Sequence, residues 1–121
     1  MPGELSTAIT SDQWERVLSL CSTKPDTAKA WTVRQGLFEG IKDSNVLPIH
    51  EALVAGAPYA IIAALLTAYP ESVYCKESSY KRLPLHCACR KNAQLQVVEI
   101  LLKSYADAAL IADSLGRLPR K

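Results

Sequence analysis

The chain has 121 residues, 49% of them hydrophobic, which is typical of one domain with a core that needs no disulfides. Its 14 basic and 12 acidic residues leave a formal net charge of +2, which excludes the strongly basic composition of a bulk nucleic-acid binder. Four cysteines at irregular spacings form no disulfide framework, so we expect reduced thiols and an intracellular, reducing compartment, whether cytoplasm, nucleus or organelle interior.

The first residues, MPGELSTAIT, lack the basic start and apolar run of a secretory signal. Residues 1–11 match no other part of the chain, and we expect them to be an N-terminal extension. The longest apolar stretch, 52–68, is interrupted by Pro58 and is too short to span a bilayer, so no membrane span is expected.

A weak copy of a later helix follows this extension. When Pro25 is aligned with Pro70, the apolar positions of 14–21 match those of 59–66. The match covers only the second helix of a unit, so residues 12–41 are expected to form a partial repeat. The apolar residues of the stretch 27–44 predict an ordered excursion, such as a short helix, in place of a flexible linker.

A clear internal repeat occupies the centre of the chain. The segment Leu47-Pro48-Ile49-His50 recurs as Leu83-Pro84-Leu85-His86, 36 residues later, and the match extends without gaps to Tyr69 and Tyr105. Chance does not explain agreement at so many apolar positions. The sequence therefore predicts full repeats over 42–75 and 76–112, and a truncated repeat over 113–121 that contains Leu118-Pro119.

Each full copy predicts two helices. Pro48 and Pro84 suit the first turn of a helix, where the missing N–H leaves no bond unmade, so first helices are expected near 48–55 and 84–91. Apolar residues at i, i+3 and i+4 predict second helices near 58–68 and 94–104. Neither helix buries its apolar face alone, so adjacent units must stack.

This pattern resembles the ankyrin-repeat family, with its D-x-x-G-x-T-P-L-H finger, short first helix and V-V-x-x-L-L second helix. The matching segments are Asp113–Pro119 for the finger, Leu83–Ala88 for the first helix and Val97–Leu102 for the second. Leucine replaces the usual threonine before each proline, which is similar to a divergent leucine-proline-leucine-histidine variety. The resemblance implies an all-α fold over 12–121: a short solenoid of about two full repeats with a partial repeat at each end.

His50 and His86 are candidate catalytic bases or metal ligands, but they recur once per repeat. The resemblance implies a structural role for both, in which each ring bridges backbone groups at the start of its own helix behind Pro48 or Pro84. Cys87 and Cys89 follow His86, but residues i and i+2 of a helix do not face each other and no second ligand pair exists. We therefore expect no metal site and no cofactor.

No catalytic motif is present, and the carboxylates are scattered without a spacing that demands acid–base chemistry. We expect neither catalytic residues nor a small-molecule substrate, and the chain is not expected to be an enzyme. An enzyme would require a pocket between the stack and residues 27–44, which the sequence does not indicate.

The resemblance implies a non-catalytic protein–protein interaction module, an adaptor or a peripheral subunit of a larger assembly. In ankyrin-type stacks the partner contacts finger tips and the exposed side of the first helices. By alignment, the partner-binding residues are Tyr80, Lys81, Arg82, Arg90, Lys91, Leu115 and Arg117. The cations among them predict an acidic partner surface. Two alternatives stay open: the charges only keep an exposed face in solution, or the basic stripe serves a nucleic-acid-associated, for example ribonucleoprotein, subunit.

Overall fold

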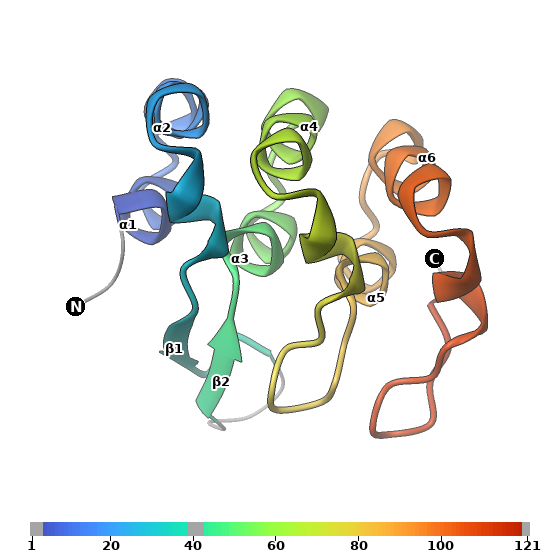
Figure 1. Ribbon diagram of the computed structural model, residues 1–121. Coiled ribbons are helices and arrows are strands. Elements are labelled where there is room, and N and C mark those ends of the chain that lie inside the picture. The colour runs from blue at the N-terminus through green and yellow to red at the C-terminus, as the bar shows by residue number, and fades with distance from the viewer. Residues whose placement is uncertain (1–3, 39–42, 120–121) are drawn as a thin grey trace.

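The computed structural model describes residues 4–38 and 43–119 of the chain. The resemblance implied an all-α fold; over these residues the fold is mainly helical but also contains one two-stranded sheet. Three helical hairpins lie side by side in chain order (Figure 1). The first helices of the hairpins form one row and the second helices form another. The helices are α1 (Glu4–Thr10), α2 (Trp14–Thr23), α3 (Pro48–Ala55), α4 (Tyr59–Ala68), α5 (Pro84–Arg90) and α6 (Leu95–Ser104).

A short 3₁₀ helix follows each hairpin and leads into a connection that projects to the same side of the molecule (Figure 1). These helices are η1 (Pro25–Lys29), η2 (Pro70–Tyr74) and η3 (Ala106–Leu110). We call the projecting connections finger 1 (30–38 and 43–47), finger 2 (75–83) and finger 3 (111–118). Pro25 and Pro70 are the first residues of η1 and η2, a position that favours proline because its missing N–H would be unpaired there.

The helices expected from the repeat, α3 to α6, are present within one residue of their predicted ends. Leu47 and Leu83 are extended, because a residue before proline is disfavoured in the helical region. Pro48 and Pro84 then take the first helical position. The leucine–proline step therefore determines where each first helix begins.

All three hairpins make the same turn. A residue with left-handed backbone geometry follows each first helix: Asp12 at φ 56°, Gly56 at φ 76° and Asn92 at φ 52°. Glycine, asparagine and aspartate are the residues that adopt this region most readily. The next residue then donates its N–H to a carbonyl five positions back, at 2.9 to 3.0 Å. The bonded pairs are Gln13 with Ala8, Ala57 with Ala52, and Ala93 with Ala88.

Helix α1 is therefore the counterpart of α3 and α5, although residues 1–11 match neither in sequence. Leu5, Ala8 and Ile9 are buried, and α1 packs on α2 and α3. Sequence comparison matched only the second helix of this hairpin, because α1 lacks the leucine-proline-x-histidine start of the other two. Its small buried alanine and its left-handed Asp12 are what it shares with them.

The excursion 27–44 differs from the expectation of a short helix. Beyond the end of η1 it forms strand β1 (Thr32–Gln35), which pairs antiparallel with β2 (Asp43–Val46). Thr32 lies opposite Val46 and Gln35 opposite Asp43. Alternate burial along β1 is the period of a strand, and its β-branched Thr32 and Val33 favour that conformation.

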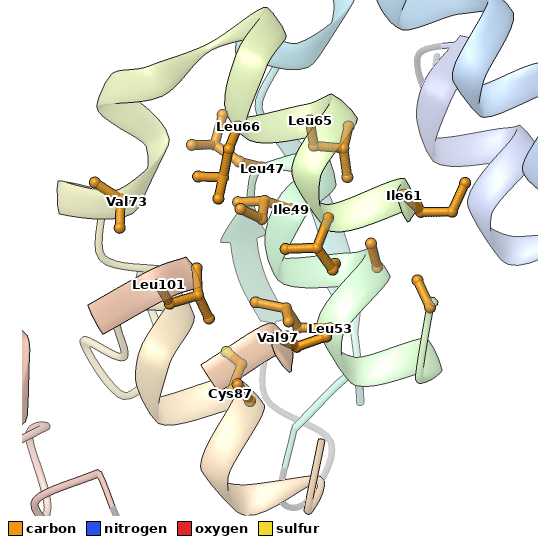
Figure 2. Packing of buried hydrophobic residues seen from close by; sticks show 14 of the residues in the cluster. Leu47, Ile49, Leu53, Ile61, Leu65, Leu66, Val73, Cys87, Val97 and Leu101 are labelled. Carbon is orange, nitrogen blue, oxygen red and sulfur yellow. The ribbon is translucent and has the colours of Figure 1, made fainter. Parts of the chain in front are cut away.

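The core lies between successive hairpins, and Figure 2 shows its part between α3 and α4 on one side and α5 and α6 on the other. Ala52 and Ala88 are fully buried on the first helices, where a larger side chain would hold the rows apart. Burying each of the surrounding leucine, isoleucine and valine side chains stabilises the fold by about 1.5–3 kcal/mol. The labelled side chains are Leu47, Ile49, Leu53, Ile61, Leu65, Leu66, Val73, Cys87, Val97 and Leu101.

Candidate protein-binding face

Finger 2 is folded around the carboxylate of Glu77, which is fully buried. The carboxylate accepts the N–H groups of Ser79 and Tyr80, each at 2.7 Å, and that of Arg82 at 3.1 Å. It also accepts the Ser79 hydroxyl at 2.5 Å. Burial opposes ionisation of Glu77, but these hydrogen bonds outweigh it and hold the pKa of the carboxyl below its ordinary value.

Finger 3 repeats this construction with a shorter side chain. Asp113 lies 36 residues after Glu77, and its Oδ1 accepts the N–H groups of Leu115 at 2.9 Å and Arg117 at 3.0 Å. Burial again opposes ionisation, but the hydrogen bonds from Arg117, Arg82 and Leu115 lower the pKa of Asp113. The resemblance located Asp113 but not Glu77, because the spacing of 35 residues between Leu83 and Leu118 aligns Asp113 with Ser78.

Arg82 is not available to a partner, contrary to the expectation from the sequence, because its side chain is fully buried. Its Nε donates to Oδ2 of Asp113 at 3.3 Å. Its guanidinium lies 4.6 Å from the centre of the Tyr80 ring and 5.5 Å from that of Phe38. At these distances the faces of both rings attract a cation. Arg82 thus joins residues of all three fingers.

The remaining predicted partner-binding residues lie at the surface of fingers 2 and 3 and of α5. Lys81, Arg90, Lys91 and Arg117 are exposed, Leu115 is 49% exposed and Tyr80 is half-buried. In the described residues 75–91 and 111–118, every exposed charged side chain is a cation, because Glu77 and Asp113 are both buried. We call the surface of Tyr80, Lys81, Arg90, Lys91, Leu115 and Arg117 the basic face.

The basic face contains two hollows, and Arg90 lines both of them. The smaller hollow, of about 140 Å³, opens between finger 1 and helices α3 and α5; the larger, of about 400 Å³, opens between α5 and finger 3. The smaller is lined by Leu37, Phe38, Val54, Arg82, Cys87, Arg90 and Lys91. The larger is lined by His86, Arg90, Asp113, Gly116, Arg117, Leu118 and Pro119.

His50 and His86 join helices α3 and α5, respectively, to the segments that follow their hairpins. Nδ1 of His50 accepts the N–H of Leu47 at 3.0 Å, so the neutral ring carries its proton on Nε2 and donates it to the carbonyl of Cys75, also at 3.0 Å. Complete burial lowers the pKa of His50 to about 4, despite the opposing hydrogen bond to Cys75. Both ring nitrogens of His50 are therefore bonded to backbone groups, one in its own helix start and one in the segment after the hairpin.

His86 repeats these bonds one hairpin later. Its Nδ1 accepts the N–H of Leu83 at 2.9 Å, and its Nε2 lies 2.8 Å from the carbonyl oxygen of Ile111. Burial lowers the pKa of His86 as well, against the hydrogen bond to Ile111. Pro48 and Pro84 are buried and are the first residues of α3 and α5, the helices that carry the two rings.

Of the four cysteines, Cys87 lines the smaller hollow. Burial raises the pKa of Cys87 to about 12, so its thiol stays protonated and behaves as a small apolar group. Across the part of the chain that the structure describes, no group of three or more His, Cys, Asp or Glu residues is arranged to hold a metal ion. None of the helices described is both long and apolar enough to cross a membrane.

Comparison with known proteins gives one match. No curated protein and no solved structure is matched by the chain. A protein-family model described as "Ankyrin repeat" matches residues 80–114, which run from finger 2 through α5, α6 and η3 into finger 3. The matched segment contains Arg90, which lines both hollows, and Asp113, the carboxylate of finger 3. Residues 80–114 of the chain are therefore similar to an ankyrin repeat, as the resemblance in the sequence indicated.

Proposed function

We propose that the chain is a non-catalytic protein-binding module, an adaptor or a peripheral subunit of a larger assembly, which binds its partner through the basic face. Ankyrin repeats bind other proteins, and the family is generally non-enzymatic. The observation that carries the proposal is the charge of the surface. Exposed cations occupy finger 2, α5 and finger 3, while the carboxylates of the same segments are buried in backbone hydrogen bonds.

We also infer that the three hairpins are successive ankyrin-like repeats of a short solenoid. Three recurring features support this inference: the left-handed turn residue of each hairpin, the histidine bridges of the second and third, and the finger carboxylates Glu77 and Asp113. In this interpretation the first repeat includes α1, and the repeat domain begins before residue 12. The proposed units then end near 41, 75 and 112, and a further one begins at 113.

An acidic partner surface fits the basic face best, because exposed charges across an interface steer encounter and select partners by complementarity. Arginine and tyrosine are also the residues most enriched at binding hot spots, and the face contains Arg90, Arg117 and Tyr80. The neighbouring positions of α3, Val54 and Ala55, carry no charge. We therefore propose that binding is centred on α5 and the two fingers beside it.

Charge reversal tests the proposal. Affinity-tagged Arg90→Glu is compared with the wild type for the proteins that co-purify with it, quantified by mass spectrometry. The matched control is Lys103→Glu, the same change in charge on exposed α6. We expect the bound partner to fall at least tenfold for Arg90→Glu and to be unchanged for Lys103→Glu, with equal urea midpoints for all three proteins. Undiminished capture by Arg90→Glu would show that the basic face does not bind the partner.

A nucleic-acid-associated role is the second candidate, because the same exposed cations suit phosphate groups. Its test is the salt dependence of binding to a 20-nucleotide single-stranded RNA. Neutralising several phosphates makes the logarithm of affinity fall steeply with the logarithm of salt concentration. A strong response that Arg90→Glu weakens would favour this role, and undetectable binding at low salt would exclude it.

We propose a reducing, intracellular compartment for this module. The four cysteines are free thiols, and Cys87 and Cys89 are buried in α5 where no disulfide partner faces them. Alkylation of unreduced cell extracts tests this: Cys21 and Cys75, which are partly exposed, should label without prior reduction. Labelling only after reduction would contradict the proposal.

A further inference from the structure

We propose that the smaller hollow of the basic face, which we call the Phe38 hollow, takes one apolar side chain from an extended, acidic segment of the partner. This inference rests on the proposed function and specifies the partner: a linear acidic peptide with an apolar anchor, in place of an acidic surface of any shape.

The size of the Phe38 hollow favours a single side chain. Its volume is about 140 Å³. Sites for cofactors and drug-sized ligands are larger, about 300–1,000 Å³. Interface hot spots, by contrast, are anchors that fill small, well-packed pockets.

Apolar and cationic side chains share the lining of the hollow. Phe38, Val54 and the protonated thiol of Cys87 supply its apolar part, whereas Arg90 and Lys91 are exposed beside it. An aliphatic or aromatic side chain would lose water inside the hollow, and carboxylates on either side of it would meet the two cations. A lysine or arginine anchor would meet like charge there.

The hollow is formed before any partner arrives. The Phe38 ring is held against the guanidinium of Arg82, which is itself fixed by Asp113 from finger 3. Cys87 and Val54 lie on helices α5 and α3, which pack directly on each other. A preformed pocket gains affinity because little conformational freedom is lost on binding.

The position of Arg90 indicates how the segment runs. Arg90 lines both hollows, and the other lining residues belong to finger 1 and α3 in the smaller hollow and to finger 3 in the larger, so the hollows lie on either side of Arg90. We take their separation as roughly one helix spacing, about 8–10 Å. An extended chain advances about 3.3 Å per residue, so about three residues span that distance. The anchor in the Phe38 hollow and the residue that reaches Arg117 in the larger hollow should therefore lie about three positions apart. The residue that reaches Arg117 should be acidic.

A displayed library of random twelve-residue peptides, selected on the immobilised full chain, tests the inference. We expect the selected peptides to share one apolar residue flanked by aspartate or glutamate, with an acidic residue about three positions from the anchor. A consensus peptide is then synthesised with a fluorescent label and its Kd is measured by anisotropy. Selection of peptides without acidic residues or without a common apolar position, or of none above background, would overturn the inference.

Two substitutions separate this inference from the proposed function. Val54→Phe fills the hollow without changing charge, and should weaken the consensus peptide about tenfold or more. Replacing the anchor of the peptide by alanine should have a similar effect on the wild type and little on Val54→Phe. The control Leu95→Phe adds an aromatic ring to an exposed position of α6 and should bind as the wild type does.

The smaller change Val54→Met serves if Val54→Phe lowers the urea midpoint. Unchanged binding by both Val54 variants, together with loss of binding by Arg90→Glu, would overturn the anchor and leave the basic face intact. Unchanged binding by all three variants would overturn both the inference and the proposed function.

Discussion

Finger 1 and finger 2 project side by side from the same fold, but they are held by different interactions. Finger 2 is organised by one buried carboxylate, Glu77, which accepts backbone N–H groups from its own loop. The residue 36 positions before Glu77 is Ile41, which cannot accept a hydrogen bond through its side chain and lies outside the described residues. Finger 1 is held by the β1–β2 ladder and by Arg34, whose guanidinium pairs with the buried carboxylate of Glu51 on α3.

The comparison shows that a buried carboxylate and a strand ladder are two alternative ways to hold a finger. The short loop of finger 2 makes one backbone hydrogen bond across its base, from the Glu77 N–H to the Arg82 carbonyl at 3.0 Å, and the Glu77 carboxylate accepts the N–H groups of the turn between them. In its described residues, the longer finger 1 pairs strand with strand, and its ion pair is made to Glu51 on helix α3. Finger 3 is built in the same way as finger 2, with Asp113 as the carboxylate that accepts backbone N–H groups. The two arrangements meet at Arg82, which lies between Phe38 of finger 1 and Tyr80 of finger 2.

Removing the carboxylate of finger 2 should have the largest effect. We expect Glu77→Ala to lower the free energy of unfolding by about 4 kcal/mol, because three N–H groups and a hydroxyl lose their acceptor in a buried position. Urea unfolding followed by circular dichroism measures it. Glu99→Ala, at an exposed site on α6, is the control and should change stability by less than about 0.5 kcal/mol. A loss below about 1 kcal/mol for Glu77→Ala would mean that finger 2 does not depend on its carboxylate.

The corresponding test of finger 1 is Arg34→Ala. It leaves Glu51 buried without its cation, and the only remaining hydrogen bond described for that carboxylate is from Ser6 at 2.7 Å. Breaking a buried ion pair costs about 3–5 kcal/mol, and because Arg34 is partly exposed we expect the lower end, about 3 kcal/mol. The double variant Arg34→Ala with Glu51→Gln should recover at least half of the loss, since no charge is then buried. Failure of this recovery would show that Arg34 acts through packing and not through charge.

The histidine bridges are common to both regions and should make the fold sensitive to acid. The pKa of His50 is lowered from 6.5 to about 4 in the folded chain, so the unfolded chain binds a proton first as the pH falls. The stabilisation is complete above pH 6.5 and is lost between pH 6.5 and 4. We expect His50 alone to account for a loss of about 2 kcal/mol between pH 7 and pH 5.

His50→Asn removes this titration and should flatten the dependence, measured as urea unfolding free energy at pH 7, 6 and 5. His86, whose pKa is lowered in the same direction, will leave a remaining slope. The lowered pKa values of Glu77 and Asp113 act only below their ordinary values of 4.5 and 3.8, so this pH window isolates the histidines. Equal slopes for His50→Asn and the wild type would contradict the assignment.

Helices α3 to α6 were predictable because their determinants are local. The proline at the first position and the apolar spacing each lie within the helix that they predict. Helix α1 was not, because its shared features with α3 are one buried alanine and one left-handed turn residue, which are too few to distinguish it in a sequence. β1 was missed because its partner strand lies beyond residues 39–42 and strand pairing is a long-range interaction.

The basic face was predicted in outline but not in detail, for the same reason. Lys81, Arg90, Lys91 and Arg117 are exposed as alignment to the finger pattern indicated, whereas Arg82 is buried by an ion pair with a residue 31 positions away. In the sequence Arg82 is one of two adjacent cations, and nothing local distinguishes it from Lys81. Burial of an arginine depends on where its carboxylate comes from, and that is decided by the stacking of fingers 2 and 3.

The smallest expected effect concerns the contact between fingers 1 and 2. The buried hydroxyl of Ser44 donates to that of Ser79 at 2.5 Å, and Ser79 in turn donates to Glu77, so the two fingers share one chain of hydrogen bonds. We expect Ser44→Ala to cost about 1 kcal/mol, the net value of one hydrogen bond, because Ser79 still bonds to the carboxylate. In the background of Glu77→Ala the same substitution should cost clearly less, since the chain of bonds no longer ends on a charge. Equal costs in both backgrounds, measured by a urea double-mutant cycle, would mean that the two fingers are stabilised independently.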